Sequence, residues 1–386
     1  MIVPISGQVT GEAEVYNVSL VAQSNHYAGG EWTHRFERGF ADFMGARHAI
    51  LCNSGSSANL LALAALELPK GSEVITCAVN FPTTVNAIIQ LGLVPVFVDA
   101  DPKTLNVDGI QGIYEAMGHR TRALILAHTL GNPFDIAGIG VNLYDWLKII
   151  EDCCDAIGST INGEMVGRRG VMSTASFYPA HHITMGEGGA VLTDSPKLKK
   201  IIESYRDWGR DCWCAPGEDN TCGRRFKSGR DHKYEYSRIG WNLKANDFAA
   251  AVGVAQLDRL EGFIAKRREN WAYLYEGLKD LPIEIVEATP NSNPSWFGFA
   301  FLTDRRKELS PYLDSNGIGC RPIMAGNLLN QTAYKKLERG VDYKVIGDLK
   351  GAERIDSEGI WIGVFPGITH EMRDYQIDVV RKFYGK

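Results

Sequence analysis

The chain has 386 residues, which suggests two or three structural units, or one large α/β catalytic domain with an appendage. Hydrophobic residues make up 45% and charged residues 23%, a balance that argues against disorder. The 41 basic and 46 acidic residues leave a net charge of −5, so no positive field favours nucleic acid or anionic lipid. The longest apolar run (60–66) is far shorter than a membrane span, and the N-terminus lacks the regions of a secretory signal. We therefore expect a cytoplasmic enzyme with no membrane or nucleic-acid partner.

The first two thirds of the chain alternates short β-rich runs with helical stretches. This alternation predicts βαβ units, and hence an α/β fold with a mostly parallel sheet covered by helices on both faces. Such sheets bind ligands beyond the C-terminal ends of their strands, where we expect the chemistry. The expected strands are 49–53, 73–78, 94–98, 123–127, 147–153, 173–178 and 190–193, with helices at 57–68 and 82–90.

The last third has a different pattern. Residues 247–281 predict one long helix or two joined helices. Short strands at 296–301 and 359–364, with helices at 307–316 and 370–383, then predict a small α+β domain. We expect a large domain over 1–250, followed by the long helix and a small C-terminal domain over 251–386.

A first motif, Asn-Ser-Gly-Ser-Ser-Ala-Asn at 53–59, lies between a predicted strand and an Ala/Leu-rich helix. Gly55 permits a tight turn, and Ser56 and Ser57 place hydroxyls beside the unpaired N–H groups of the helix start. That arrangement can cradle a phosphate, although a serine there is equally a plain helix cap.

A second motif, Ile-Ile-Glu-Asp-Cys-Cys-Asp at 149–155, is an apolar strand that ends in acids. A carboxylate at such a strand end can pair with a protonated ring nitrogen, or it can simply cap a helix or form a salt bridge.

A third motif runs from Ser173 to Ala190 and contains Ser-Phe-Tyr-Pro-Ala-His-His-Ile-Thr-Met-Gly-Glu-Gly-Gly. With the other two, it resembles the DegT/DnrJ/EryC1/StrS family of sugar aminotransferases, over nearly the whole chain. The resemblance implies the fold-type I, aspartate aminotransferase-like fold of pyridoxal-phosphate (PLP) enzymes and a homodimer. In that family a Ser-Phe-x-x-x-Lys run supplies the lysine that binds the cofactor covalently. Ser176 begins the matching run here, and His181 stands at the lysine position.

This exchange determines the predicted function. Imidazole has no primary amine and cannot form a Schiff base with the cofactor, but its ordinary pKa of ~6.5 suits it to move protons. The His is similar to that of the nucleotide 4-keto-6-deoxyhexose 3-dehydratases, which implies a noncovalently held pyridoxamine phosphate (PMP). A degenerate, inactive aminotransferase is the alternative.

The resemblance also implies a role for each matching residue. His181 is the catalytic acid–base, and Asp155 stands near the ring hydroxyl where the family usually has Gln or His. The neighbouring His182 is expected to be structural. The cofactor contacts implied are Gly55, Ser56, Ser57 and Ser176 at the phosphate, Phe81 on the ring face, Asp152 at the ring nitrogen, and Asn242 at the phosphate of a neighbouring subunit.

The eight cysteines carry a further signal. Four of them are separated by 57, one and seven residues, and this spacing resembles the 2Fe–2S ligand set of the iron–sulfur 3-dehydrases. A four-cysteine zinc site or scattered buried thiols are the alternatives. The metal ligands implied are Cys154, Cys212, Cys214 and Cys222, and the cysteines left as core are Cys52, Cys77, Cys153 and Cys320.

A basic stretch follows the last of these ligands. It could grip a nucleotide diphosphate or an acidic redox partner, or be a solvated loop, and Arg321 is a candidate substrate contact. The stretch contains Arg224, Arg225, Lys227, Arg230 and Lys233.

The resemblance implies C3 deoxygenation of a nucleotide-linked 4-keto-6-deoxyhexose, and we expect the nucleotide to be CDP. The reaction would serve 3,6-dideoxysugar biosynthesis, and with it O-antigen and lipopolysaccharide biosynthesis. The resemblance also implies PMP/PLP and a 2Fe–2S cluster as cofactors, and an NADH-dependent flavin/iron–sulfur reductase as electron donor. The alternatives are a cluster-free, glutamate-dependent dehydratase of the colitose type, an ordinary sugar aminotransferase, and a non-catalytic binding protein.

Overall fold

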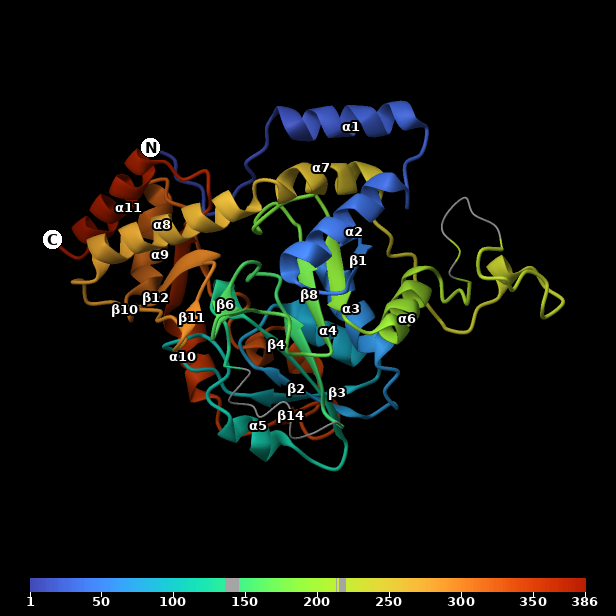
Figure 1. Cartoon of the computed structure of the whole chain (residues 1–386). Coiled ribbons are helices and arrows are strands. Elements are labelled where there is room, and N and C mark those ends of the chain that lie inside the picture. The colour runs from blue at the N-terminus through green and yellow to red at the C-terminus, as the bar shows by residue number, and fades with distance from the viewer. Residues whose placement is uncertain (136–145, 213, 215–219) are drawn as a thin grey trace.

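The computed structural model describes residues 1–135, 146–212, 214 and 220–386. A large sheet lies at the centre, covered by helices on both faces, and a smaller sheet lies at the end of the molecule that holds both termini (Figure 1). The large sheet has the order β1 (His48–Cys52), β9 (Gly189–Thr193), β8 (Met172–Ser176), β5 (Lys148–Asp152), β4 (Thr121–Ala127), β2 (Glu73–Cys77), β3 (Val94–Val98), β14 (Lys344–Val345).

The large sheet is mostly parallel, as the alternating pattern predicts. All its pairs are parallel except the two that β9 makes, with β1 and β8. Within β1, Ile50 and Cys52 pack with one group of helices, while Ala49 and Leu51 pack on the opposite face. Alternating side chains along a strand point to opposite faces, so this strand is buried on both.

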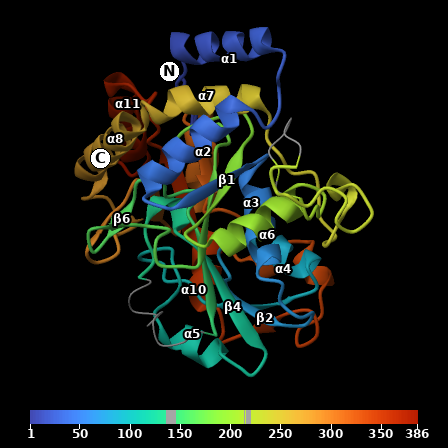
Figure 2. The same ribbon diagram turned by 45° about the vertical axis from the view of Figure 1, so that its right-hand side comes forward.

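Two helical layers cover the sheet. Helices α2 and α7 lie side by side on one face, with α1 outside them on α7, and α3, α4 and α6 pack on the other face (Figures 1 and 2). The expected single or double helix over 247–281 is two helices, α7 and α8. The helices are α1 (Glu12–Ser24), α2 (Glu31–Met44), α3 (Gly55–Ala65), α4 (Pro82–Gln90), α5 (Gln111–Ala116), α6 (Pro196–Arg206), α7 (Asp247–Leu257), α8 (Leu260–Leu278), α9 (Arg306–Ser315), α10 (Lys350–Glu358) and α11 (His370–Phe383).

The small sheet is antiparallel, with the order β10 (Glu284–Ile285), β12 (Gly298–Leu302), β15 (Gly359–Gly363), β13 (Cys320–Pro322). Helices α8, α9 and α10 contact it, and α11 covers α8 and α9. The chain crosses between the two regions more than once, because Val3 pairs with Ile318 and β14 returns to the large sheet. The boundary predicted at 250/251 lies inside α7, and the two-domain division stays a prediction.

The remaining regular elements are short. A three-stranded sheet has the order β11 (Ser292–Asn293), β6 (Thr160–Ile161), β7 (Glu164–Met165), and the single-turn helices are η1 (Thr129–Gly131), η3 (His232–Tyr234), η4 (Leu328–Asn330) and η5 (Tyr334–Lys336). Over the described ranges, none of the helices has the length and apolarity needed to cross a bilayer.

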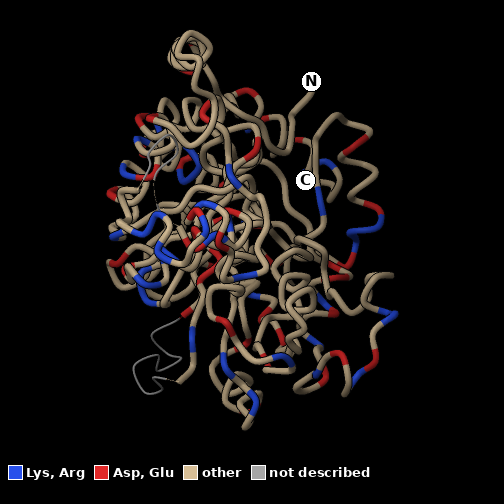
Figure 3. The backbone as a smooth tube through the Cα atoms, turned by 90° about the vertical axis from the view of Figure 1, so that its right-hand side faces the viewer, with Lys and Arg blue, Asp and Glu red and all other residues tan. Residues whose placement is uncertain are grey.

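The described residues of 207–242 (207–212, 214 and 220–242), here called the arm, extend from the body between α6 and α7 (Figure 1). Two bridges close its base, Asp207 with Asn242 and Arg210 with Tyr236. Positions 213 and 215–219 fall outside the described residues. The side of the molecule that carries the arm mixes basic and acidic positions rather than showing one sign of charge (Figure 3).

Candidate functional site

A cavity of about 750 Å³ opens where the parallel strands end, between the large sheet and the small one. Its size is in the range of ligand pockets, and its position is the one expected for an open α/β sheet. The predicted site residues that line it are Gly55, Ser56, Phe81, Asp152, Cys154, Asp155, Ser176, His181 and Arg321. None of its described lining residues is a lysine.

The N-terminus of α3 forms one wall of this cavity. The Ser54 hydroxyl caps the helix by accepting the Ser57 N–H at 3.1 Å, and Ser56 lies in the wall with its hydroxyl 2.8 Å from that of Thr83. Ser57 does not line the cavity itself. A Cβ on Gly55 would lie 2.5 Å from the Ser176 Cβ, so only glycine lets these two segments approach. The helix dipole and these hydroxyls fit an anion such as a phosphate.

Asp152 ends β5 and is nearly buried. Its Oδ2 accepts the Asn59 side-chain amide at 2.8 Å and the Thr84 hydroxyl at 2.9 Å, while its Oδ1 accepts the Cys154 N–H at 3.1 Å. Thr174 in turn donates to Asn59 Oδ1 at 2.6 Å. The network holds a carboxylate in the wall of the cavity, in a fixed orientation that suits a protonated ring nitrogen.

Sequence reasoning missed Asn59 and Thr84. The available signal was a polar residue on the otherwise apolar helix α3, and Asn59 is indeed buried there.

His181 and Asp155 form a pair at the same cavity, with 3.4 Å between His181 Nδ1 and Asp155 Oδ1. Burial, helped by the Arg267 guanidinium, lowers the pKa of His181 to about 4, so its imidazole is neutral at pH 7. Burial, helped by the Asp152 carboxylate, raises the pKa of Asp155 to about 7. A neutral base therefore lies beside a carboxyl group that can exchange a proton near neutral pH.

Arg267 of α8 was also missed by sequence reasoning, since nothing in the local pattern marks it. It is fully buried, and its guanidinium donates to the carbonyls of His181 at 2.9 Å and Phe297 at 3.1 Å. Burial lowers its pKa to about 10. This arginine fixes the backbone that carries His181.

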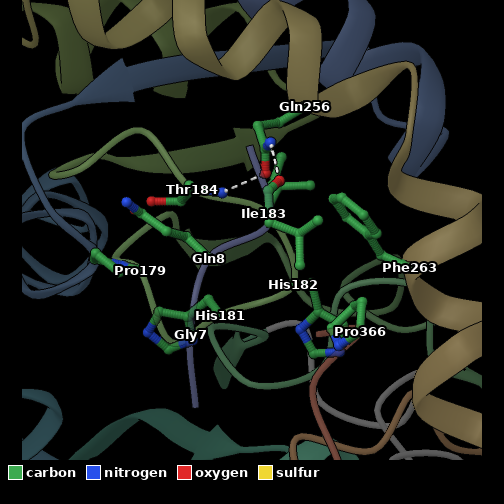
Figure 4. A pocket seen from close by; sticks show the side chains of 11 residues that line it. Gly7, Gln8, Pro179, His181, His182, Ile183, Thr184, Gln256, Phe263 and Pro366 are labelled. Atoms are coloured by element: carbon green, nitrogen blue, oxygen red, sulfur yellow. Dashed lines mark hydrogen bonds between the residues drawn. The ribbon is translucent and has the colours of Figure 1, made fainter. Parts of the chain in front are cut away.

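His182 points away from the cavity that His181 lines. It is buried, and its Nε2 lies 2.8 Å from the Ser295 carbonyl oxygen. Figure 4 shows both histidines at a separate hollow of only about 10 Å³, where Gln256 bonds to the Thr184 N–H and the Val9 carbonyl. That hollow has room for a water molecule at most. These contacts agree with a structural role for His182.

Asn242 does not line the cavity of its own chain. Its side-chain oxygen accepts from Lys244 at 2.8 Å at the base of the arm. Its expected contact with a neighbouring subunit stays a prediction.

The predicted four-cysteine set is not brought together. Cys212, Cys214 and Cys222 gather on the arm, where their sulfurs lie within 4.8 Å of one another and of a His232 ring nitrogen. Cys154 lies at the cavity instead, two residues after the end of β5, with its sulfur 3.1 Å from where a Gly55 Cβ would stand. Within the single chain the four cysteines are therefore apart, and their grouping as one ligand set stays a prediction. Sequence reasoning had no reason to include His232.

Cys214 differs from the other cysteines whose pKa is shifted, because its pKa alone is lowered. Burial raises the pKa of Cys212 to about 11. Burial alone would also raise the pKa of Cys214, but hydrogen bonds to its sulfur, among them from Thr221 and the Cys222 N–H, lower it to about 6. Burial also raises the pKa of the four thiols that we expect in the hydrophobic core, which are Cys52, Cys77, Cys153 and Cys320.

The basic stretch on the arm pairs with acids of the arm itself. Arg224 lies 3.4 Å from Asp211, and Arg225 lies 3.6 Å from Asp231. These pairs favour the solvated-loop interpretation over a diphosphate site.

Comparison with known proteins gives a family match over nearly the whole chain. The model of the DegT/DnrJ/EryC1/StrS aminotransferase family matches residues 8–381. The lipopolysaccharide biosynthesis protein RfbH of Salmonella typhimurium is 47% identical over 100% of this chain and 92% of its own. The dTDP-4-dehydro-2,6-dideoxy-D-glucose 3-dehydratase of Saccharopolyspora spinosa is 46% identical over 99% of this chain and 86% of its own.

A solved structure agrees with these relatives. The GDP-4-keto-6-deoxymannose-3-dehydratase with a trapped PLP-glutamate geminal diamine has a TM-score of 0.88 and 31% identity, covering 98% of this chain and 99% of that one. The predicted fold class, a fold-type I PLP-dependent transferase, is confirmed.

Proposed function

Because the chain belongs to the DegT/DnrJ/EryC1/StrS aminotransferase family, we propose that it is a PMP-dependent 3-dehydratase of nucleotide-linked 4-keto-6-deoxyhexoses. Two relatives that each match at least 98% of this chain are named as sugar 3-dehydratases. The coarse function, a PLP- or PMP-dependent family enzyme of deoxysugar biosynthesis, rests on the family and these relatives.

The observation that carries the proposal is His181 in the cavity wall. It occupies the position where aminotransferases of the family carry lysine, and none of the described lining residues supplies an amine in its place. The neutral imidazole could accept a proton from the C4′ carbon of the bound cofactor and return it, as a general acid–base must. Asp155 stands 3.4 Å away to position the ring and share that proton.

The other cavity residues fit the cofactor. PMP, when bound, supplies a primary amine for the sugar C4 carbonyl and an electron-withdrawing ring. The N-terminus of α3, with Ser56 and Ser176, would hold its phosphate, and Asp152 would keep its ring nitrogen protonated. Phe81, exposed at 54%, has a free face at the cavity on which a ring can stack.

The net reaction replaces the C3 hydroxyl of the sugar by hydrogen. The C3–O bond breaks, the oxygen leaves as water with one added proton, and two electrons and a second proton form the new C3–H bond. We propose that NADH supplies the electrons through a flavin-containing reductase and a 2Fe–2S cluster, and that the CDP-linked sugar is the substrate. The cysteine group on the arm supports the cluster, although the set predicted from spacing does not come together in one chain.

A glutamate-dependent dehydratase is the second candidate. The solved relative that carries a PLP-glutamate geminal diamine favours it, as does the separation of Cys154 from the other three cysteines. In that case glutamate supplies both the amine that restores PMP and, by its oxidation to 2-oxoglutarate, the two electrons. The nitrogen leaves as ammonia when the sugar ketone is released, and no reductase is needed.

One assay separates these functions. Anaerobically purified protein with PMP receives CDP-, dTDP- or GDP-linked 4-keto-6-deoxyhexose in two parallel reactions, one with NADH and reductase and one with glutamate. A ketosugar product that is one oxygen lighter supports the dehydratase. The reaction that forms it shows whether the enzyme depends on a reductase or on glutamate. A stable amino sugar would instead assign an aminotransferase, and an unchanged sugar with bound cofactor would assign a binding protein.

A further inference from the structure

Arg267 of α8 is buried between two segments that both line the cofactor cavity. Its Nη2 donates to the carbonyl oxygens of His181 at 2.9 Å and Ala180 at 3.3 Å. Its Nη1 donates to the carbonyl oxygens of Phe297 at 3.1 Å and Trp296 at 3.4 Å. One guanidinium therefore joins the loop that carries His181 to the segment that leads into β12.

A guanidinium in this position is unfavourable for stability. The side chain of Arg267 is fully buried, and the four acceptors named above are uncharged carbonyl oxygens. A buried charge destabilises a folded chain unless hydrogen bonds replace the lost water, and an apolar side chain often fills the same space at lower cost. Arginine has one property that such a side chain lacks, because its planar fork reaches two segments at once. The arrangement therefore favours a role for Arg267 in orienting the two segments.

Phe297 connects this clamp to the other side of the site. Its ring centroid lies 5.2 Å from that of the His181 ring, with the two planes tilted by 55°. The Phe297 N–H donates to the Leu130 carbonyl at 2.9 Å, and the Leu130 backbone donates to the Asp155 carboxylate. Phe297 therefore contacts His181 through its ring and is linked to Asp155 through one backbone unit.

These contacts form a closed circuit around the His181–Asp155 pair. The circuit consists of His181, Arg267, Phe297, Leu130 and Asp155. It closes across the 3.4 Å between Asp155 Oδ1 and His181 Nδ1. The imidazole cannot turn far without losing one of these contacts, and a displacement of about 1 Å in a reacting group can lower a rate by about 10²-fold.

We propose that Arg267 is the positioning residue of this circuit, and that it holds the His181 imidazole within reach of the reacting carbon of the bound cofactor. Arg267 does not line the cavity, so it acts through His181 rather than on the cofactor. The reaction that it serves rests on the proposed function, whereas the contacts of the circuit do not.

The neighbouring Arg268 provides a matched control. Its guanidinium also donates to backbone carbonyls, those of Gly158 at 2.9 Å, Pro294 at 3.0 Å and Asn293 at 3.1 Å. These three acceptors lie outside the lining of the cavity. The two arginines share a helix, a charge and a kind of partner, but Arg267 is the one that touches the loop of His181.

The first experiment measures kcat, KM and PMP affinity for wild type, Arg267→Gln, Arg267→Lys and Arg268→Gln. The full-length protein, prepared anaerobically, receives PMP, CDP-linked 4-keto-6-deoxyhexose, NADH and reductase, and circular dichroism establishes that each variant is folded. We expect Arg267→Gln to lower kcat by about 10–100-fold with PMP affinity near that of wild type, because the phosphate and ring-nitrogen sites are untouched. Arg267→Lys should recover part of kcat, and Arg268→Gln should resemble wild type.

The second experiment does not depend on deoxygenation. In a His181→Lys background, the amine at position 181 forms a Schiff base with PLP only where it reaches the cofactor aldehyde, so borohydride trapping reports its placement. We expect Arg267→Gln in this background to slow trapping by about tenfold, and Arg268→Gln to leave the rate unchanged.

A wild-type kcat in folded Arg267→Gln, or an equal loss in Arg268→Gln, would overturn the inference. A loss of PMP affinity as large as the loss of kcat would also overturn it, because the cavity as a whole would then have changed. If Arg267→Gln does not fold, a wild-type kcat in Arg267→Lys refutes the inference instead. If wild type deoxygenates none of the sugars, the proposed function fails, and equal trapping with and without Arg267→Gln would refute the positioning role separately. Absence of trapping in His181→Lys alone would refute both.

Discussion

His181 Nδ1 and Asp155 Oδ1 lie 3.4 Å apart in the wall of the cavity, although 26 positions separate them in the chain. The carboxyl lies in the turn after β5, and the imidazole lies in the loop after β8. Because burial favours the neutral form of each group, the pair can pass a proton without holding two charges. This relationship gives the first two predictions.

His181→Lys is expected to abolish deoxygenation and to bind PLP covalently, because only a primary amine forms a Schiff base. Borohydride reduction followed by peptide mass mapping would find the cofactor on residue 181. The matched variant His181→Gln removes the base without adding an amine, so it should trap nothing and lower kcat by ~10²–10⁴. Cofactor trapped on a lysine of the wild-type protein would refute the role of His181.

Asp155→Asn is expected to stabilise the cofactor-free protein at alkaline pH. The pKa of Asp155 is about 7 in the folded chain, against ~3.9 when unfolded. The contribution of this carboxyl to the free energy of unfolding is therefore complete below about pH 4 and is lost as pH rises through 7. Asparagine does not ionise, so the variant should gain about 2–4 kcal/mol on wild type between pH 5 and 8.

Urea unfolding at several pH values measures this difference. The exposed Glu261→Gln, on α8 and outside the cavity, is the control and should show no such trend. If the free energies of unfolding of Asp155→Asn and wild type changed in parallel with pH, burial would not raise the pKa of this carboxyl.

Gly55→Ala is expected to weaken PMP binding by about tenfold, because the new Cβ would lie 2.5 Å from Ser176 and push the two walls apart. Fluorescence titration with PMP measures the change. Gly262→Ala is the matched control, since no atom lies within 4 Å of its added Cβ, and it should stabilise α8 slightly. Unchanged PMP affinity in Gly55→Ala would argue against phosphate binding at this helix terminus.

The sequence by itself determined the alternating fold, the chemistry at the strand ends and the exchange of lysine for His181. These features are local. The repeat of apolar residues along a strand or helix, the glycine turn before α3 and the motif that contains His181 each lie within a short stretch of consecutive residues. The helices at 12–24, 31–44 and 196–206 were not predicted. The first packs on α7 and the other two on the sheet, so their stability depends on tertiary contacts.

Only the tertiary structure decided which distant groups meet. Asn59 reaches Asp152 across 93 positions, and Arg267 reaches the carbonyl of His181 across 86. Spacing along the chain groups Cys154 with the cysteines of the arm, whereas within one chain the fold places Cys154 at the cavity and His232 beside the other three cysteines. Spacing does not record which loops pack together, because that depends on contacts between elements far apart in the sequence.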